Sequence, residues 1–315
     1  MKCLLKIIFL LLVFDAAYGQ KSIPNIWAYG TDSALVITKR ILLTEPNNAA
    51  VRHARAQALL NNKENEAAHS ELLYALDCLK NSNIEQYNVK GIGDMLYFTF
   101  KDYKSASKTA DYILANSPNN IEGMEIKARS LQRMGLDDDA IKMFQSLLEY
   151  APRKTKFELY VIGGYSSSLG DSYENKREYF KAIQHYTNAI EFGYDNELPY
   201  NSRGRCKTFL SDFRGAILDF DSALAKFSEK NDFYYSILNR RTYAKGALKR
   251  YAEVITDATN SINSAKDKSL RAYAYYLRGD AKHELKNNAG ACLDWSKAGE
   301  LGEEEVYAMI KQFCK

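Results

Sequence analysis

Proline, cysteine and histidine are scarce in this sequence of 315 residues, which contains 5, 5 and 4 of them. Few prolines, and no long segment rich in Gly, Ser or Pro, argue against separate domains joined by flexible linkers. The formal net charge is only +4 and is spread along the chain, so nucleic acid is not an expected partner. The hydrophobic fraction of 46% is that of an ordinary globular protein, and we expect one continuous, mostly helical body.

The spacings that mark common catalytic and metal sites are also absent from the sequence. There is no HExxH, GxSxG or CxxC motif, and no two histidines form an HxxxH pair. The histidines are scattered at positions 53, 69, 185 and 283. We therefore predict no metal site, no cofactor and no enzymatic activity, because no nucleophile–base pair or ligand set can be recognised.

The N-terminus carries an apolar run over residues 7–14, preceded by Lys2 and Lys6. Small residues at Ala17 and Gly19 are spaced for cleavage before Gln20, which predicts a signal peptide over residues 1–19. The alternative is an uncleaved anchor, but the run is well short of the ~20 residues of a spanning helix. We expect an exported protein, periplasmic or secreted, with no stable membrane insertion after cleavage.

A four-position pattern recurs in the C-terminal half, where residues 278–299 read RGDAKHELKNNAGACLDWSKAG. A glycine is followed twelve residues later by alanine, four further by a large aromatic residue, and three further by another alanine. The three copies are Gly279, Ala291, Trp295 and Ala298; Gly204, Ala216, Phe220 and Ala223; and Gly170, Ala182, Tyr186 and Ala189. Such self-similarity indicates a repeat protein.

Weaker copies of the pattern extend over the rest of the chain. The small residue that opens each second helix falls at 68, 106, 140, 182, 216, 254 and 291, at intervals of 38, 34, 42, 34, 38 and 37. Prolines at 46, 118 and 152 are placed to end second helices. A hairpin of two helices with one apolar face cannot bury that face alone, so neighbouring copies are expected to stack in a row.

The pattern resembles the tetratricopeptide repeat, a helix–turn–helix unit of ~34 residues. The resemblance implies an all-α fold, a right-handed superhelical solenoid of antiparallel helix pairs with a C-terminal capping helix. We expect a partial repeat over residues 20–46, an array of about seven units over 47–303, and the cap over 304–315. The ending, GACLDWSKAGELG followed by a terminal cysteine, resembles the closing unit of exported tetratricopeptide proteins of the Gram-negative envelope.

An Arg-Gly-Asp tripeptide at residues 278–280 falls inside this pattern. Cell-adhesion signals of this type lie on exposed loops. The repeat places the tripeptide in a helix instead, with Gly279 facing the partner helix at its closest approach. We therefore interpret the glycine as a packing residue.

Four cysteines remain after signal cleavage, and they allow three disulfide pairings. Cys292 lies near the start of the last second helix and Cys314 near the end of the cap. The two residues meet if the cap folds back antiparallel, so we predict a Cys292–Cys314 disulfide, the alternative being two buried free thiols. Cys78 and Cys206 are expected to be core residues.

In the fold that the resemblance implies, the first helix of each unit lines a concave groove. The positions three before, two before and one after the repeat glycine face this groove. The candidate binding residues are Asn201, Arg205, Asn239, Arg240, Tyr243, Tyr276 and Asp280. Asn, Arg and Tyr suit an extended peptide, and the alternative is that these residues are simply solvated.

One subclass of these repeats clamps the C-terminal carboxylates of a peptide with basic residues in three units. Here Tyr273 and Leu277 replace the basic residues of the third unit, so the clamp is not carried over. We expect a non-enzymatic scaffold of the bacterial envelope or exterior that binds a protein or peptide in its groove. The alternative is an accessory subunit of an envelope assembly that binds through its convex face or caps.

Overall fold

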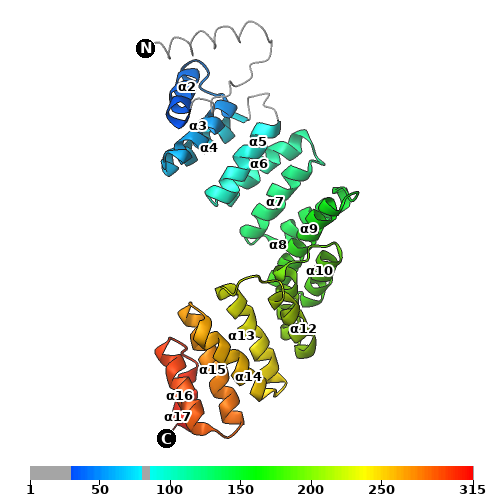
Figure 1. The fold of residues 1–315 in the computed structure, drawn as a ribbon. Coiled ribbons are helices and arrows are strands. Elements are labelled where there is room, and N and C mark those ends of the chain that lie inside the picture. Colours follow the sequence, from blue (N-terminus) through cyan, green and yellow to red (C-terminus); the bar gives the residue numbers. More distant parts are fainter. Residues whose placement is uncertain (1–29, 80–85, 315) are drawn as a thin grey trace. The chain divides into compact units, whose positions relative to one another are not determined.

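A computed structural model describes residues 30–79 and 86–314, and these contain helices and turns but no strand (Figure 1). The signal peptide, and residues 20–29 of the partial repeat, lie outside the described residues. The chain divides into two compact units, one ending at Met143 and the other beginning at Phe144. The division falls within helix α8 (Asp137–Tyr150).

The first unit begins with a single helix, α2 (Thr31–Thr44), which packs on the first helix of a hairpin. Its other helices are α3 (Ala49–Asn61), α4 (Asn65–Cys78), α5 (Gln86–Asp94), the π-helical turn η3 (Met95–Thr99), α6 (Tyr103–Asn116) and α7 (Ile121–Arg133). Helices α3 and α4 pack as one hairpin, and α5 with η3 packs on α6 as the next. Helices α2 and α6 stop two residues before Pro46 and Pro118, the prolines predicted to end them.

The second unit contains four hairpins and a short last helix. The first helices are α9 (Lys156–Asn175), α11 (Glu197–Phe209), α13 (Asp232–Ala247) and α15 (Lys268–Glu284); the second helices are α10 (Tyr179–Glu191), α12 (Phe213–Leu224), α14 (Tyr251–Ser264) and α16 (Asn288–Glu300). Every helix packs on the next one along the chain. First helices start at polar caps, such as Asn196 and Asn231, whose side-chain oxygens accept backbone N–H groups.

The turn inside each hairpin has one residue in the left-handed conformation. These residues are Lys63, Lys101, Gly135, Arg177, Ser211, Lys249 and Lys286, with φ between 55° and 74°. Each lies five residues before the small residue that opens the second helix, so the turns repeat the intervals of the sequence pattern. Only Gly135 is the residue type that this conformation favours. The pattern of turns confirms the repeat as a helix–turn–helix unit.

The repeat glycines allow the two helices of a hairpin to approach closely. A Cβ atom on Gly279 would lie 2.6 Å from the indole ring of Trp295, and one on Gly204 would lie 2.7 Å from the ring of Phe220. Gly170 meets Tyr186 in the same way at 2.8 Å. Because these rings are fully buried, they fill the space that each glycine leaves. The Arg-Gly-Asp tripeptide accordingly lies inside α15, as predicted.

In each of the last three hairpins an arginine directly precedes the position of the repeat glycine, which is threonine in the middle copy. This arginine joins its hairpin to the hairpin before it. We call this contact the arginine bridge. In the last copy, Arg278 donates two hydrogen bonds to the buried carboxylate of Asp294 in α16 and a third to Thr259 in α14. A lysine one turn later binds the same carboxylate. The three copies are Arg203, Lys207 and Asp219; Arg241, Lys245 and Asp257; and Arg278, Lys282 and Asp294.

The chain ends in a short helix, α17 (Val306–Phe313), which packs on α16. Val306 is completely buried in a cluster that includes Ala291 and Trp295. A disulfide joins Cys292 and Cys314 across 22 residues, whereas Cys78 and Cys206 are buried and outside any disulfide. In the chain-entropy account a loop of this length contributes about 3 kcal/mol. The helix begins slightly later than expected, because the acidic residues 303–305 form the turn that precedes it.

Replacing Gly279 by alanine is expected to lower the stability of the protein by about 1–3 kcal/mol. The added Cβ would overlap the ring of Trp295, which is fully buried and cannot move aside. The control is Gly164→Ala in α9. There the added Cβ would lie 3.6 Å from the nearest atom, in the ring of Tyr194, and the higher helix propensity of alanine should raise stability by up to about 1 kcal/mol. Urea unfolding monitored by circular dichroism distinguishes the two, and a stabilised Gly279→Ala variant would contradict the packing argument.

Candidate functional site

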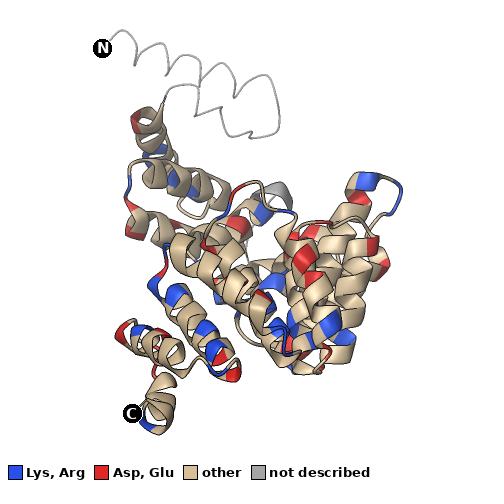
Figure 2. Ribbon diagram, turned by 60° about the horizontal axis from the view of Figure 1, so that its bottom comes forward, with Lys and Arg blue, Asp and Glu red and all other residues tan. Residues whose placement is uncertain are grey.

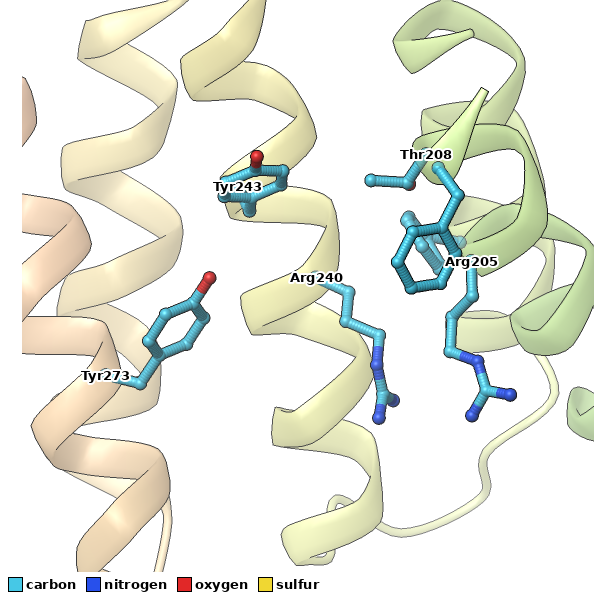
Figure 3. Close-up of a pocket in the computed structure, with 7 residues that line it drawn as sticks. Arg205, Thr208, Arg240, Tyr243 and Tyr273 are labelled. Carbon is cyan, nitrogen blue, oxygen red and sulfur yellow. The ribbon is translucent and has the colours of Figure 1, made fainter. Parts of the chain in front are cut away.

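The second unit has a pocket between its successive first helices. Residues from α11, α12, α13 and α15 line it: Arg205, Thr208, Phe209, Phe220, Arg240, Tyr243 and Tyr273. The cavity is about 170 Å³ in volume and open to solvent. In Figure 3 the guanidinium groups of Arg205 and Arg240 lie side by side, with Tyr243 and Tyr273 beyond them. Two cations and several rings therefore surround one small space.

Arg240 is a half-buried cation without a carboxylate partner among the described residues. Its Nη1 donates to Oδ1 of Asn201 at 3.2 Å, a neutral acceptor on α11. Burial, together with the neighbouring Arg205 guanidinium, lowers the pKa of Arg240. A guanidinium in this position gains from an anion, because a charge-assisted hydrogen bond would replace the water that burial has removed.

Arg205, by contrast, already has an ionic partner inside the protein. Its guanidinium donates to Oε1 of Glu174 in α9, through Nε at 3.0 Å and Nη2 at 2.5 Å. Burial opposes its charge, but the Glu174 carboxylate raises the pKa of Arg205 overall. Arg205 is thus ion-paired, whereas Arg240 has no ion-pair partner among the described residues, although the nearby Glu174 carboxylate also favours its charged form.

Glu174 belongs to a buried network that also includes Tyr186 and Asp171. The Tyr186 hydroxyl lies 2.7 Å from Asp171 Oδ1 and 2.8 Å from Glu174 Oε2. A hydroxyl has one proton and cannot donate to both carboxylates, so both contacts are hydrogen bonds only when one of the two acids is protonated. Burial raises the pKa of Asp171 to about 6, which identifies Asp171 as the acid that holds this proton most readily.

Aromatic rings form the apolar wall of the pocket, and two of them have a ring from a neighbouring element beside them. Phe209 stacks on Tyr179 with centroids 4.8 Å apart, and Tyr243 packs edge-on to Phe213. Phe209 and Tyr243 remain 63% and 45% exposed. Burial raises the pKa of Tyr273 to about 12, so its hydroxyl is neutral at physiological pH and can donate a hydrogen bond. Exposed rings held by other rings can accept an apolar group with little loss of side-chain entropy.

Four of the seven residues expected in the groove do not line this pocket. Asn201 and Asn239 are buried, and their amides bind other helices: Asn201 accepts from Arg240, and Asn239 donates to the Leu270 carbonyl. Asp280 accepts from the Trp295 indole, and Tyr276 packs beside Tyr273 outside the pocket lining. The two asparagines join neighbouring hairpins, whereas Asp280 binds within its own hairpin and Tyr276 packs within α15.

Arg205, Arg240 and Tyr243 do line the pocket, together with Phe220 of the repeat pattern and three further residues, none of which the sequence analysis selected as binding residues. Thr208 lies four residues after Gly204, and Phe209 follows it at the end of α11. Tyr273 lies six residues before Gly279. A helix repeats every 3.6 residues, so positions one turn beyond the three that were counted could have identified Thr208 and Tyr273.

Charge is interspersed over the helices, as Figure 2 shows for basic and acidic residues. Over residues 30–79 and 86–314, no helix is long and apolar enough to cross a membrane. The same residues contain no cluster of three or more His, Cys, Asp or Glu side chains that could hold a metal ion.

Comparison with known proteins relates the chain to tetratricopeptide-repeat proteins, although no family model matches it. It is 26% identical over 212 residues to tetratricopeptide repeat protein 1 of Schizosaccharomyces pombe, a match over 66% of this chain and 20% of that protein. The chain thus spans about a fifth of the length of this curated relative.

Solved structures show the same fold. A tetratricopeptide repeat protein from Parabacteroides merdae superposes with a TM-score of 0.54 at 15% identity, covering 85% of this chain and 99% of that one. BtubC from P. vanneervenii superposes with a TM-score of 0.52 at 15% identity, covering 65% and 90%. At these identities the likeness concerns the fold alone.

The protonation of Asp171 predicts a pH dependence of stability. Its folded-state pKa of about 6 lies above the ordinary value of 3.8, so its contribution is fully present below pH 3.8 and is lost as the pH rises through 6. Relative to Asp171→Asn, which stays neutral, the wild type should lose about 2–3 kcal/mol of unfolding free energy between pH 4 and pH 7.

Urea unfolding of both proteins across this range provides the measurement. The difference between them isolates Asp171, because other groups, such as the buried His53, are present in both. Two parallel stability curves would contradict the assignment of the proton to Asp171.

Proposed function

We propose that this chain, a tetratricopeptide-repeat protein, is a non-enzymatic scaffold that holds a segment of a protein partner in the pocket between α11, α13 and α15. The observation that carries the proposal is the combination of the half-buried Arg240 guanidinium with the exposed rings of Phe209 and Tyr243. Aromatic and arginine side chains supply most of the binding energy at protein interfaces. The three bridge arginines and Arg205 each have a carboxylate partner, whereas Arg240, which lines the pocket, has none among the described residues.

We further propose that the protein acts outside the cytoplasm, in the periplasm or exterior of a Gram-negative-type cell. The N-terminal sequence with its cleavage spacing before Gln20 supports export. The Cys292–Cys314 disulfide supports it too, because such bonds persist mainly in oxidising compartments.

A second candidate function is that of an accessory subunit whose partner binds on the other side of the hairpins. The observation in its favour is a pair of exposed leucines at equivalent repeat positions. Leu218 in α12 and Leu293 in α16 each lie fourteen residues after their repeat glycine, and they are 68% and 74% exposed. Neither residue lines the pocket.

Substituting tryptophan for Thr208 tests the pocket, because the indole would occupy the cavity beside Arg240. We expect Thr208→Trp to reduce recovery of the partner from extracts of the source cells by at least about tenfold, a loss of about 1.4 kcal/mol. The matched control is Leu218→Trp, which adds the same ring to the same hairpin outside the pocket and should leave recovery unchanged. The opposite result would favour the second candidate function.

Intact-mass analysis of the protein recovered from its source tests export and the disulfide together. The expected mass lacks residues 1–19. Under denaturing conditions two thiols, those of Cys78 and Cys206, should be alkylated before reduction, and four should be alkylated after it. A full-length mass, or four reactive thiols in the unreduced protein, would contradict the proposal of an exported, oxidised protein.

A further inference from the structure

We propose that the pocket recognises an acidic side chain, Asp or Glu, within an internal segment of the partner, with a neighbouring aromatic or aliphatic residue against Phe209. This inference rests on the proposed function and specifies the chemistry of the bound segment. Arg240 would bind the carboxylate, and the rings of Phe209, Tyr243 and Tyr273 would cover its flanks.

The sign of the ligand's charge follows from the different partners of Arg240 and Arg241. Arg241, the next residue of α13, is bound by the carboxylates of both Asp257 and Asp221. Arg240 turns to the pocket and has only the amide oxygen of Asn201. Since successive residues of a helix point about 100° apart, one arginine serves the packing of hairpins and the other faces the cavity. A half-buried cation with a neutral partner is suited to an incoming anion.

The charge of the ligand follows from the ion pairing of the two arginines at the pocket. Arg205 is neutralised by Glu174, and its pKa is raised by that pairing. Tyr273 is neutral, and its hydroxyl can donate a hydrogen bond but adds no charge. A single guanidinium without an ion-pair partner, with rings beside it, fits a singly charged carboxylate better than a phosphate, whose second charge would have no partner in this pocket.

The size and lining of the cavity favour a side chain over a free C-terminus or a larger molecule. A volume of about 170 Å³ is below the 300–1,000 Å³ typical of pockets for drug-sized ligands. A C-terminal acidic residue presents two carboxylates, but α15 contributes Tyr273 to the lining and no second cation. The exposed face of Phe209 beside the cavity can cover the adjacent apolar residue.

Selection from a displayed peptide library tests this inference on the full oxidised chain. Random decapeptides fused at their C-termini to a phage coat protein have no free C-terminal carboxylate, so any enrichment in acid reports side chains. We expect pools bound by the wild type to be enriched about tenfold in Asp or Glu next to an aromatic or aliphatic residue, as expected for one hydrogen-bonded ion pair.

Three variants make the result decisive. Arg240→Gln should abolish the enrichment in acids, and Arg240→Lys should partly restore it by returning the charge. Arg214→Gln removes an exposed arginine from α12 outside the pocket, and it should match the wild type. Retained acidic enrichment with Arg240→Gln, or pools without acids, would overturn the inference.

The selection also separates the inference from the proposed function. If Thr208→Trp loses peptide binding but the wild-type pools contain no excess of acids, the pocket binds peptides and only the acidic specificity is wrong. If Thr208→Trp retains all peptides, or the wild type selects none, the proposed function fails as well. Acidic enrichment that occurs only in a library with free C-termini would contradict the internal-segment assignment.

Discussion

The arginine bridge is the contact on which the arrangement of the second unit depends. A hairpin of two helices leaves an apolar face uncovered, and that face is buried only when the next hairpin is held in register. The bridge provides this register because one guanidinium binds two hairpins at once. Arg241 binds Asp257 within its own hairpin and Asp221 in the preceding one. Because Asp219 and Asp294 are almost completely buried, breaking such a pair leaves a buried charge, which typically costs about 3–5 kcal/mol.

The pocket is a consequence of this register. When α11, α13 and α15 are held side by side, Thr208, Arg240 and Tyr273 come to line one cavity, although they are far apart in the sequence. Arg240 and Arg241 are adjacent in the chain and have opposite roles. The ion pairs of Arg241 hold α13 in place. In this position of the helix Arg240 lines the pocket and has no ionic partner in the described structure. Packing and recognition are therefore assigned to neighbouring positions of one helix.

The sequence predicted the repeat, the phase of the helices and the close approach of Gly279 to its partner helix, because these depend on contacts within one hairpin. It did not predict which polar residues face solvent. Asn201 and Asn239 are buried because of the hairpin beside them, and the partner of Arg205 is Glu174, 31 residues earlier in another hairpin. Such pairings depend on the rotation between repeats, which the residues of a single repeat do not specify. The recurring Arg, Lys and Asp of the bridge were a usable signal, since their spacing from the repeat position is the same in three units.

The measurement that tests this account most directly is amide hydrogen exchange of the full oxidised chain with Arg241 replaced by methionine. Methionine keeps much of the apolar stem and removes the guanidinium that binds the α11–α12 hairpin to the α13–α14 hairpin. The account predicts that amides in both hairpins lose protection together and by similar factors, because each hairpin depends on the other. A loss confined to α13–α14, with α11–α12 as protected as in the wild type, would contradict it.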